Sequence, residues 1–325
     1  MKRLFAAISV IFVFVISARP IVQFPQAEIT NGLINARLYL PDIKNGYYRG
    51  SRFDWSGVMP KLEYQRHTYF GQWFDKYSPT LHDAIMGPVE AFSPVGYDKA
   101  KVGDNFLIVG IGMVTKPEEP KYSFVTPYQI SNPGVWSVQK EADAVEFVHT
   151  LNDKDYAYEY RKTVQLIKGK PEMVLSHTLK NIGKQTIETN VYNHNFFVID
   201  KQTVGAGFVV KFPFNLINEA QQTGDVNLGR INNSEILFLK NLSENEHLFY
   251  PSLKGFSNSP KDYDIRVENR KTGAGVRITS DQPLSKLVFW SAPATLCPEP
   301  YITIKVNPGQ EYSWKIMYEF YTIPG

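Results

Sequence analysis

One histidine and one glutamate, far apart in the chain, are the residues best suited by type and by sequence neighbours to transfer protons. His194 lies in the aromatic-flanked segment 192–197, and Glu299 lies between two prolines in the segment 297–300. Histidine changes its protonation state near neutral pH, and a glutamate reaches the same range when burial raises its pKa. Such a pair could move one proton onto a bound molecule and another off it. The flanking prolines restrict the backbone of Glu299, which favours a fixed carboxylate direction.

Each member of this pair also has an ordinary structural interpretation. His194 stands between two asparagines, where backbone carbonyl groups could satisfy its ring. Glu299 could be an exposed residue of a Pro-Glu-Pro turn. Little else in the sequence points to chemistry, because it has no phosphate loop and no serine-centred elbow. Cys297 is the only cysteine, so no intrachain disulfide can form.

No cofactor, metal or nucleic acid is expected. The six histidines show neither an i, i+4 spacing nor a CxxC-like neighbourhood of the kind that metal sites use. A calcium site assembled from loops needs no such motif and stays open. The formal net charge of +3 is small, and the basic residues are spread through the chain rather than clustered. A nucleic-acid-binding protein would show a basic patch.

Apolar and polar residues alternate with a period of two along most of the chain, which is typical of strands. We therefore expect strands to position His194 and Glu299. Alternating apolar and polar residues predict strands at 36–40, 105–109, 144–148, 173–179, 264–269, 275–278, 286–290 and 301–306. Glycine, proline and asparagine turns separate these ranges. The pattern predicts an all-β protein built as a long antiparallel sandwich.

Two other segments carry local predictions. The range 75–86 could hold a short helix. The range 117–133 contains four prolines and predicts a long surface loop. Long loops in compact domains are often functional.

The N-terminus has the pattern of an export signal. Lys2 and Arg3 precede an apolar run at 4–16, and small residues follow up to Ala18. Cleavage after Ala18 would leave a single domain at 19–325, located in the periplasm or outside a bacterial cell. An uncleaved N-terminal anchor is the alternative. No later apolar stretch reaches the roughly 18 residues of a membrane span, so no stable membrane insertion is expected after cleavage.

Several segments, taken in their order along the chain, carry a family resemblance. The order begins with three strand-like segments, 136–138, 156–166 and 177–183, and continues with His194, which an aromatic pair follows. Glu299 before a proline comes next, and the order ends with a proline-glycine turn and an aromatic strand at 308–320. This order resembles the galactose mutarotase-like family, to which aldose 1-epimerases belong. The resemblance covers roughly residues 28–323. It implies a supersandwich of large twisted antiparallel sheets that holds a sugar in its concave face.

The resemblance also implies a reaction, the interconversion of sugar anomers, with His194 as general acid and Glu299 as general base. In this reaction the C1 hydroxyl is deprotonated while the ring oxygen is protonated. The ring then opens, the aldehyde rotates, and the ring closes on the other face. Each catalytic group could contribute about 10²–10⁴-fold. Neither a metal nor a nucleotide is required, and the substrate is expected to be a sugar or a uronic-acid-type saccharide.

The N-terminal third departs from the family pattern. Aldose epimerases usually carry an Asn-Arg-Ile segment and a second histidine, but the corresponding range 81–92 contains no arginine. His82 is the candidate for the second histidine, and Arg52 is the candidate substitute for the arginine. Glu90 is a further candidate substrate contact, and Trp290 is a candidate stacking platform for a sugar ring.

These four candidates and the activity itself have alternatives. His82 could be a loop or helix-cap histidine, and Glu90 could be a solvated carboxylate. Arg52 could form an ion pair with Asp54 and pack on the Trp55 ring, and Trp290 could be a core residue. Fold does not determine function, so a non-catalytic carbohydrate-binding protein of the same fold is a second hypothesis. A polysaccharide-processing enzyme is a third, weakened because the helical toroid domain of such lyases is absent from this sequence. The sequence leaves the oligomeric state open.

Overall fold

The computed structural model describes residues 24–219 and 227–324. The expected export signal lies outside the described residues. Within them, the regular elements are strands and two short 3-10 helices, η1 (Ile199–Lys201) and η2 (Pro260–Asp262). The expected all-β class is therefore confirmed. No helix in the described part of the chain is long and apolar enough to cross a membrane.

The largest layer is a ten-stranded antiparallel sheet. Its order is β16 (Gly229–Asn232), β17 (Glu235–Phe238), β14 (Phe208–Lys211), β19 (Asp264–Asn269), β20 (Ala274–Ser280), β23 (Glu311–Thr322), β12 (Glu172–Asn181), β11 (Ala157–Leu166), β10 (Ala144–Asn152) and β9 (Val135–Lys140).

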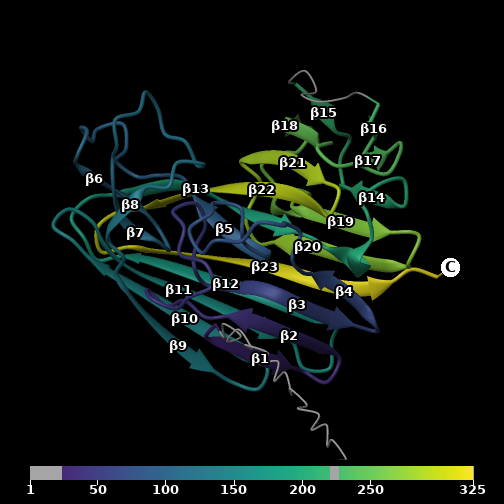
Figure 1. The fold of residues 1–325 in the computed structure, drawn as a ribbon, viewed down its shortest axis with the longest axis horizontal. Coiled ribbons are helices and arrows are strands. Elements are labelled where there is room, and N and C mark those ends of the chain that lie inside the picture. Colours follow the sequence, from purple (N-terminus) through teal and green to yellow (C-terminus); the bar gives the residue numbers. More distant parts are fainter. Residues whose placement is uncertain (1–23, 220–226, 325) are drawn as a thin grey trace, which may run out of the picture.

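A second layer of six antiparallel strands lies against the long central strands of this sheet, above them in Figure 1. Its order is β15 (Ile217–Asn218), β18 (Leu248–Lys254), β21 (Lys286–Ala292), β22 (Thr295–Val306), β13 (Ile187–Phe196) and β5 (Gly87–Phe92).

Two small antiparallel sheets complete the fold. One contains β1 (Gln26–Thr30), β2 (Ile34–Tyr39), β3 (Val58–Tyr64) and β4 (His67–Phe70), and the other contains β6 (Asn105–Ile108), β7 (Gly112–Thr115) and β8 (Gln129–Asn132). The first of these sheets is drawn in purple and blue in Figure 1, in front of the ten-stranded sheet.

Alternation along each strand builds the core between the two large sheets. In β23, Trp314, Ile316, Tyr318 and Phe320 are buried while the residues between them are exposed or half-buried. The Trp314 ring stands edge-on to Phe92 of β5, with centroids 6.3 Å apart, which joins the two layers. Each such apolar side chain stabilises the fold by roughly 1.5–3 kcal/mol.

All the ranges predicted as strands overlap strands of the structure. The possible helix at 75–86 is wrong. This range contains turns, in which the backbone N–H of Leu81 bonds Ser78 and that of Ala84 bonds Leu81. The long loop at 117–133 is present up to Tyr128, and its last residues form β8.

Candidate functional site

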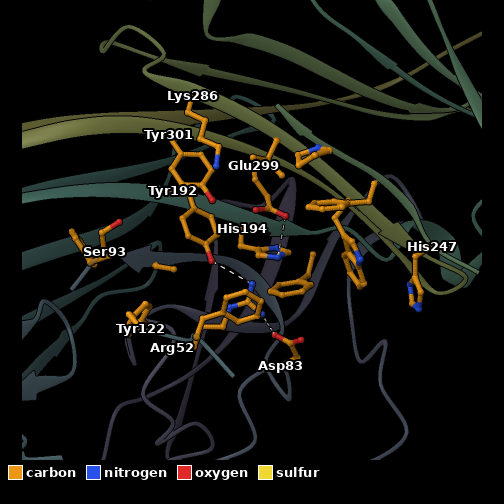
Figure 2. Close-up of a pocket in the computed structure, with 18 of the residues that line it drawn as sticks. Arg52, Asp83, Ser93, Tyr122, Tyr192, His194, His247, Lys286, Glu299 and Tyr301 are labelled. Atoms are coloured by element: carbon orange, nitrogen blue, oxygen red, sulfur yellow. Dashed lines mark hydrogen bonds and ion pairs between the residues drawn. The ribbon is translucent and has the colours of Figure 1, made fainter. Parts of the chain in front are cut away.

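A pocket of about 980 Å³ lies on the face of the six-stranded sheet that points away from the ten-stranded sheet. Its wall comes from alternate residues of β13, β21 and β22, from the segments around Arg52 and Asp83, and from loop residues Tyr122 and Phe124 (Figure 2). The pocket is in the upper part of the range of roughly 300–1,000 Å³ typical of small-molecule sites.

His194 and Glu299 meet in this pocket. Their closest atoms, Nε2 of His194 and Oε1 of Glu299, are 3.4 Å apart. Both residues are nearly enclosed, with 3% and 6% of their surface exposed. The backbone-satisfied alternative for His194 does not hold, because its Nδ1 has no hydrogen-bond partner among the described residues. The exposed-turn alternative for Glu299 is wrong, because this residue is buried within strand β22.

Strand register explains why two residues so distant in sequence meet. β13 pairs with β22 up to Tyr192 opposite Tyr301, and an isolated bridge further on sets Phe197 opposite Leu296. The same register carried between these points sets His194 opposite Glu299. Directly opposed residues on an antiparallel pair have Cβ atoms about 4.5–5.5 Å apart, so their side chains meet on one face.

Pro298 and Pro300 interrupt the backbone hydrogen bonds between β13 and β22 at this point. Leu296 exchanges both backbone hydrogen bonds with Phe197, the residue that follows β13. Because the hydrogen-bonding direction alternates along a strand, Pro298 and Pro300 also face β13, where neither has an N–H to donate. The regular pairing is therefore interrupted beside Glu299.

Burial controls the charge of the pair. Burial raises the pKa of Glu299 to about 7, although the nearby cations Arg52 and Lys286 act in the opposite direction. Burial also lowers the pKa of His194 well below its usual value, and the positive charge of Arg52 lowers it further. At neutral pH, His194 is therefore an uncharged imidazole, and Glu299 is close to half protonated.

Arg52 lines the pocket and is held from three sides. Its guanidinium pairs with the carboxylate of Asp83, and its Nη2 donates to the Tyr192 hydroxyl at 3.3 Å. The guanidinium carbon also lies 4.1 Å from the centre of the Phe124 ring. Arg52 thus lies at the pocket, as its candidate role requires. Its ion pair is with Asp83 and its ring contacts are with Phe53 and Phe124, so the alternative pairing with Asp54 beside Trp55 does not hold.

His82 does not line the pocket itself. Its Nε2 lies 3.1 Å from the carboxylate of Asp83. Through Asp83 it supports Arg52, so the structure places it behind the pocket wall rather than at a substrate.

Glu90 points to the opposite face of the sheet. Its carboxylate pairs with Lys162 and lies 2.9 Å from Nε2 of His177, and Asn193 donates to it at 3.0 Å. The physical reason is the period of two along β13 and β5. Tyr192 and His194 face the pocket, so Asn193 and its cross-strand partner Glu90 face the core. The solvated alternative does not hold either, because Glu90 is fully buried.

Trp290 lines the pocket, as expected for a stacking platform. Its ring is nearly parallel to that of His247, with centroids 5.7 Å apart and an angle of 19°. His247 precedes β18 and also lines the pocket. The Trp290 ring also lies edge-on to the His194 ring, with centroids 6.3 Å apart, so it stands beside the His194–Glu299 pair.

Other pocket residues were not singled out from the sequence: Asp83, Tyr122, Phe124, Tyr192, His247, Lys286 and Tyr301. Two of them, Tyr192 and Tyr301, could have been found from their spacing in the sequence. Tyr192 lies two positions from His194, Tyr301 lies two positions from Glu299, and side chains two apart on a strand share a face. The loop residues had only the long proline-rich range as a signal.

No group of three or more histidine, cysteine, aspartate or glutamate residues could hold a metal ion in the part of the chain that the structure describes.

No protein-family model matches the sequence, and no curated protein matches it. Solved structures do match the fold. The Slr1438 protein of Synechocystis sp. PCC 6803 is similar with a TM-score of 0.58 at 14% identity, covering 95% of this chain and 100% of that chain.

Two further solved structures are named for the family. A galactose mutarotase-like protein from Clostridium acetobutylicum has a TM-score of 0.56 at 13% identity, with 92% of this chain and 95% of that chain covered. An aldose epimerase homologue from C. elegans has a TM-score of 0.53 at 13% identity, with 92% and 99% covered. At such identities the likeness shows the fold, which is galactose mutarotase-like. The resemblance stated from the sequence is confirmed at this level.

Proposed function

We propose that this protein interconverts the anomers of a sugar by general acid–base catalysis at His194 and Glu299. The observation that carries the proposal is the meeting of these two side chains, 3.4 Å apart, in a pocket large enough for a sugar. The galactose mutarotase-like fold and the names of its structural neighbours support a carbohydrate ligand. Export to the periplasm or the cell exterior stays a prediction of the N-terminal sequence.

The number of protons that His194 and Glu299 hold together fits this reaction. The C1 hydroxyl must lose a proton while the ring oxygen gains one, so the pair must hold one transferable proton and one free acceptor. A protonated Glu299 with a neutral His194 has the same number of protons as an ionised Glu299 with a protonated His194. In the free protein, burial keeps this proton on Glu299.

In the proposed catalytic form the proton has moved to His194, which gives it to the ring oxygen while Glu299 accepts the proton of the C1 hydroxyl. After the aldehyde rotates, the reverse transfers close the ring and restore the pair. The buried setting strengthens both interactions, since water does not screen them. Arg52, fixed by Asp83 and Tyr192, is placed to contact sugar hydroxyls from the pocket wall.

The test is anomer interconversion followed by NMR or polarimetry with freshly dissolved α-glucose, α-galactose and a uronic acid. Glu299→Gln and His194→Gln should each lose about 10²–10⁴-fold of the acceleration. Glu188→Gln is the matched control, because Glu188 lies on β13 but forms an exposed pair with Lys305. It should keep the wild-type rate.

The second hypothesis, a non-catalytic carbohydrate-binding protein, is separated by the same experiment. The aromatic rings of Trp290 and His247 in the pocket wall support binding whether or not turnover occurs. Saturable binding of a sugar by calorimetry without any acceleration would establish that alternative and overturn the catalytic proposal.

A further inference from the structure

The charges that line the pocket are nearly all compensated within the protein. Arg52 is paired with Asp83. Glu246 is paired with Lys240 at 2.6 Å and accepts the backbone N–H of Ser243 at 2.7 Å.

Lys286 is the exception among the described charged residues of the pocket wall, because none of the ion pairs of the described structure includes it. A lysine ammonium is a compact positive charge with three donors. The pocket wall therefore presents one positive charge that no carboxylate of the protein neutralises by direct contact.

The position of Lys286 is set by the same register that forms the catalytic pair. On β21 and β22, Lys286 is opposite Tyr301, and Val288 is opposite Glu299. Lys286 is therefore the diagonal neighbour of Glu299 on the same face, at roughly 7–8 Å between backbone positions. That separation is comparable to the length of one pyranose ring with its exocyclic group.

The surface between these two residues is aromatic. The rings of Tyr301 and Tyr192 stack at 4.5 Å with an angle of 22°, and the ammonium of Lys286 lies 5.1 Å from the Tyr301 ring centre. Figure 2 shows Lys286, Tyr301 and Tyr192 together on one side of His194 and Glu299, with His247 on the other side. Lys286 is exposed at the pocket wall, so its long side chain is free to turn toward a ligand.

We infer that the sugar bound here carries an anionic group, and that Lys286 binds this group while His194 and Glu299 face the anomeric carbon. The inference rests on the proposed sugar site and deepens it, since it names the substrate class. A uronic acid supplies the anion as a carboxylate, and a sugar phosphate supplies it as a phosphate. A neutral hexose offers no partner for the ammonium.

Specificity is expected to depend on this charge. An anionic sugar brought next to an ionised Glu299 without Lys286 would be repelled by it. The ammonium offsets that repulsion and forms a charge-assisted hydrogen bond, which is stronger than a neutral one.

Calorimetry with the full chain at pH 6 tests the inference, using glucuronate, galacturonate, glucose 6-phosphate, glucose and galactose as probes. At least one anionic sugar should bind roughly tenfold to hundredfold more tightly than its neutral counterpart. Lys286→Met should remove most of this ratio, and Lys286→Arg should keep it. Lys305→Met is the matched control, because Lys305 lies further along β22 in an exposed pair with Glu188. It should leave the ratio unchanged.

The outcomes separate this inference from the proposed reaction, because binding is measured without turnover. An anion preference that depends on Lys286, without acceleration of anomer interconversion, supports the inference and overturns the reaction. Acceleration with equal binding of neutral and anionic sugars overturns the inference and leaves the reaction. Preference for glucose 6-phosphate over both uronates supports an anion site and selects the phosphate. Absence of binding by all the anionic probes overturns the inference.

Discussion

The side-chain amide of Asn195 donates a hydrogen bond of 2.9 Å to the carbonyl oxygen of Pro298 on the neighbouring strand. The carbonyl of Asn195 itself accepts from the backbone N–H of Phe197 at 2.9 Å. The first contact joins β13 to β22 one position from His194 and Glu299, where the ladder is interrupted. The second lies within one segment and gives the Asn195 carbonyl a donor, since Pro298 has no N–H to offer it.

Asn195→Ala should therefore destabilise the fold. The substitution removes the donor to the buried Pro298 carbonyl, and an unsatisfied buried acceptor costs about 1–3 kcal/mol. Urea denaturation measures the change in the free energy of unfolding. The control is Asn190→Ala on the same strand, where the asparagine is exposed and its side chain accepts a hydrogen bond from the Thr303 hydroxyl. This control should change stability by no more than about 0.5 kcal/mol. Equal effects of the two substitutions would contradict the assigned role of Asn195.

The proposed anomer interconversion should lose its rate as the pH rises through about 7. Near that pH Glu299 gives up the one transferable proton of the pair, and His194 is already neutral. At lower pH the rate should stay constant until the pair takes up a second proton on His194, which leaves no free acceptor. This happens only well below the usual pKa of histidine. The measurement is the enzyme-dependent rate between pH 5 and pH 9, after subtraction of the uncatalysed rate at each pH.

Lys286→Met should shift the pH–rate profile in a defined direction. The Lys286 charge lowers the pKa of Glu299, so its removal should raise that pKa. The alkaline limb of the rate profile should then move to higher pH. A limb that stays in place or moves to lower pH would show that Glu299 does not set it.

The ion pair of Arg52 and Asp83 should be coupled more strongly than a surface pair. The side chain of Arg52 is 9% exposed, and that of Asp83 is 32% exposed. A double-mutant cycle with Arg52→Met and Asp83→Asn should give a coupling free energy of about 1.5–3 kcal/mol in unfolding experiments. The comparison cycle uses the exposed pair of Arg37 and Glu28, for which about 0.2–1 kcal/mol is expected. Coupling of the same size in both cycles would refute the tight anchoring of Arg52.

Glu90 and Lys162 form a fully buried pair behind the site, so removing one partner should be costly. Glu90→Gln or Lys162→Met alone should destabilise the protein by about 3–5 kcal/mol, because the other charge is left buried and unpaired. The double substitution should recover part of that loss. Glu63→Gln, which breaks the exposed pair with Lys61, is the control and should have little effect.

The pH dependence of this contribution follows from the Glu90 carboxyl. Burial disfavours its charge, but Lys162 and His177 outweigh burial and hold its pKa at about 2, below the usual glutamate value of 4.5. A lowered carboxyl pKa stabilises the fold above the unfolded value, and this stability is lost as the pH falls toward the folded value. The difference in unfolding free energy between wild type and Glu90→Gln should thus shrink between pH 4.5 and pH 2. A constant difference would contradict the assignment.

The strands themselves could be predicted from the sequence, because alternation is a local property of the chain. The range 264–269 coincides with β19, and 173–179 lies inside β12. The candidate pair could be predicted as well, since His194 and Glu299 stand out by type and by their order among the family-like segments. The helix at 75–86 was wrong because turns there satisfy the backbone locally.

The tertiary structure decided which face each side chain occupies and which distant residues meet. Alternation along β5 does not reveal which side of the sheet is the core, so the sequence alone did not place Glu90 beside Lys162 and His177. Lys286 became notable only once the register of β21 and β22 set it beside Glu299. The sequence by itself determined the residue types and the strand period. Cross-strand register and burial, which depend on residues far apart in the chain, determined their partners and the pKa values of the pair.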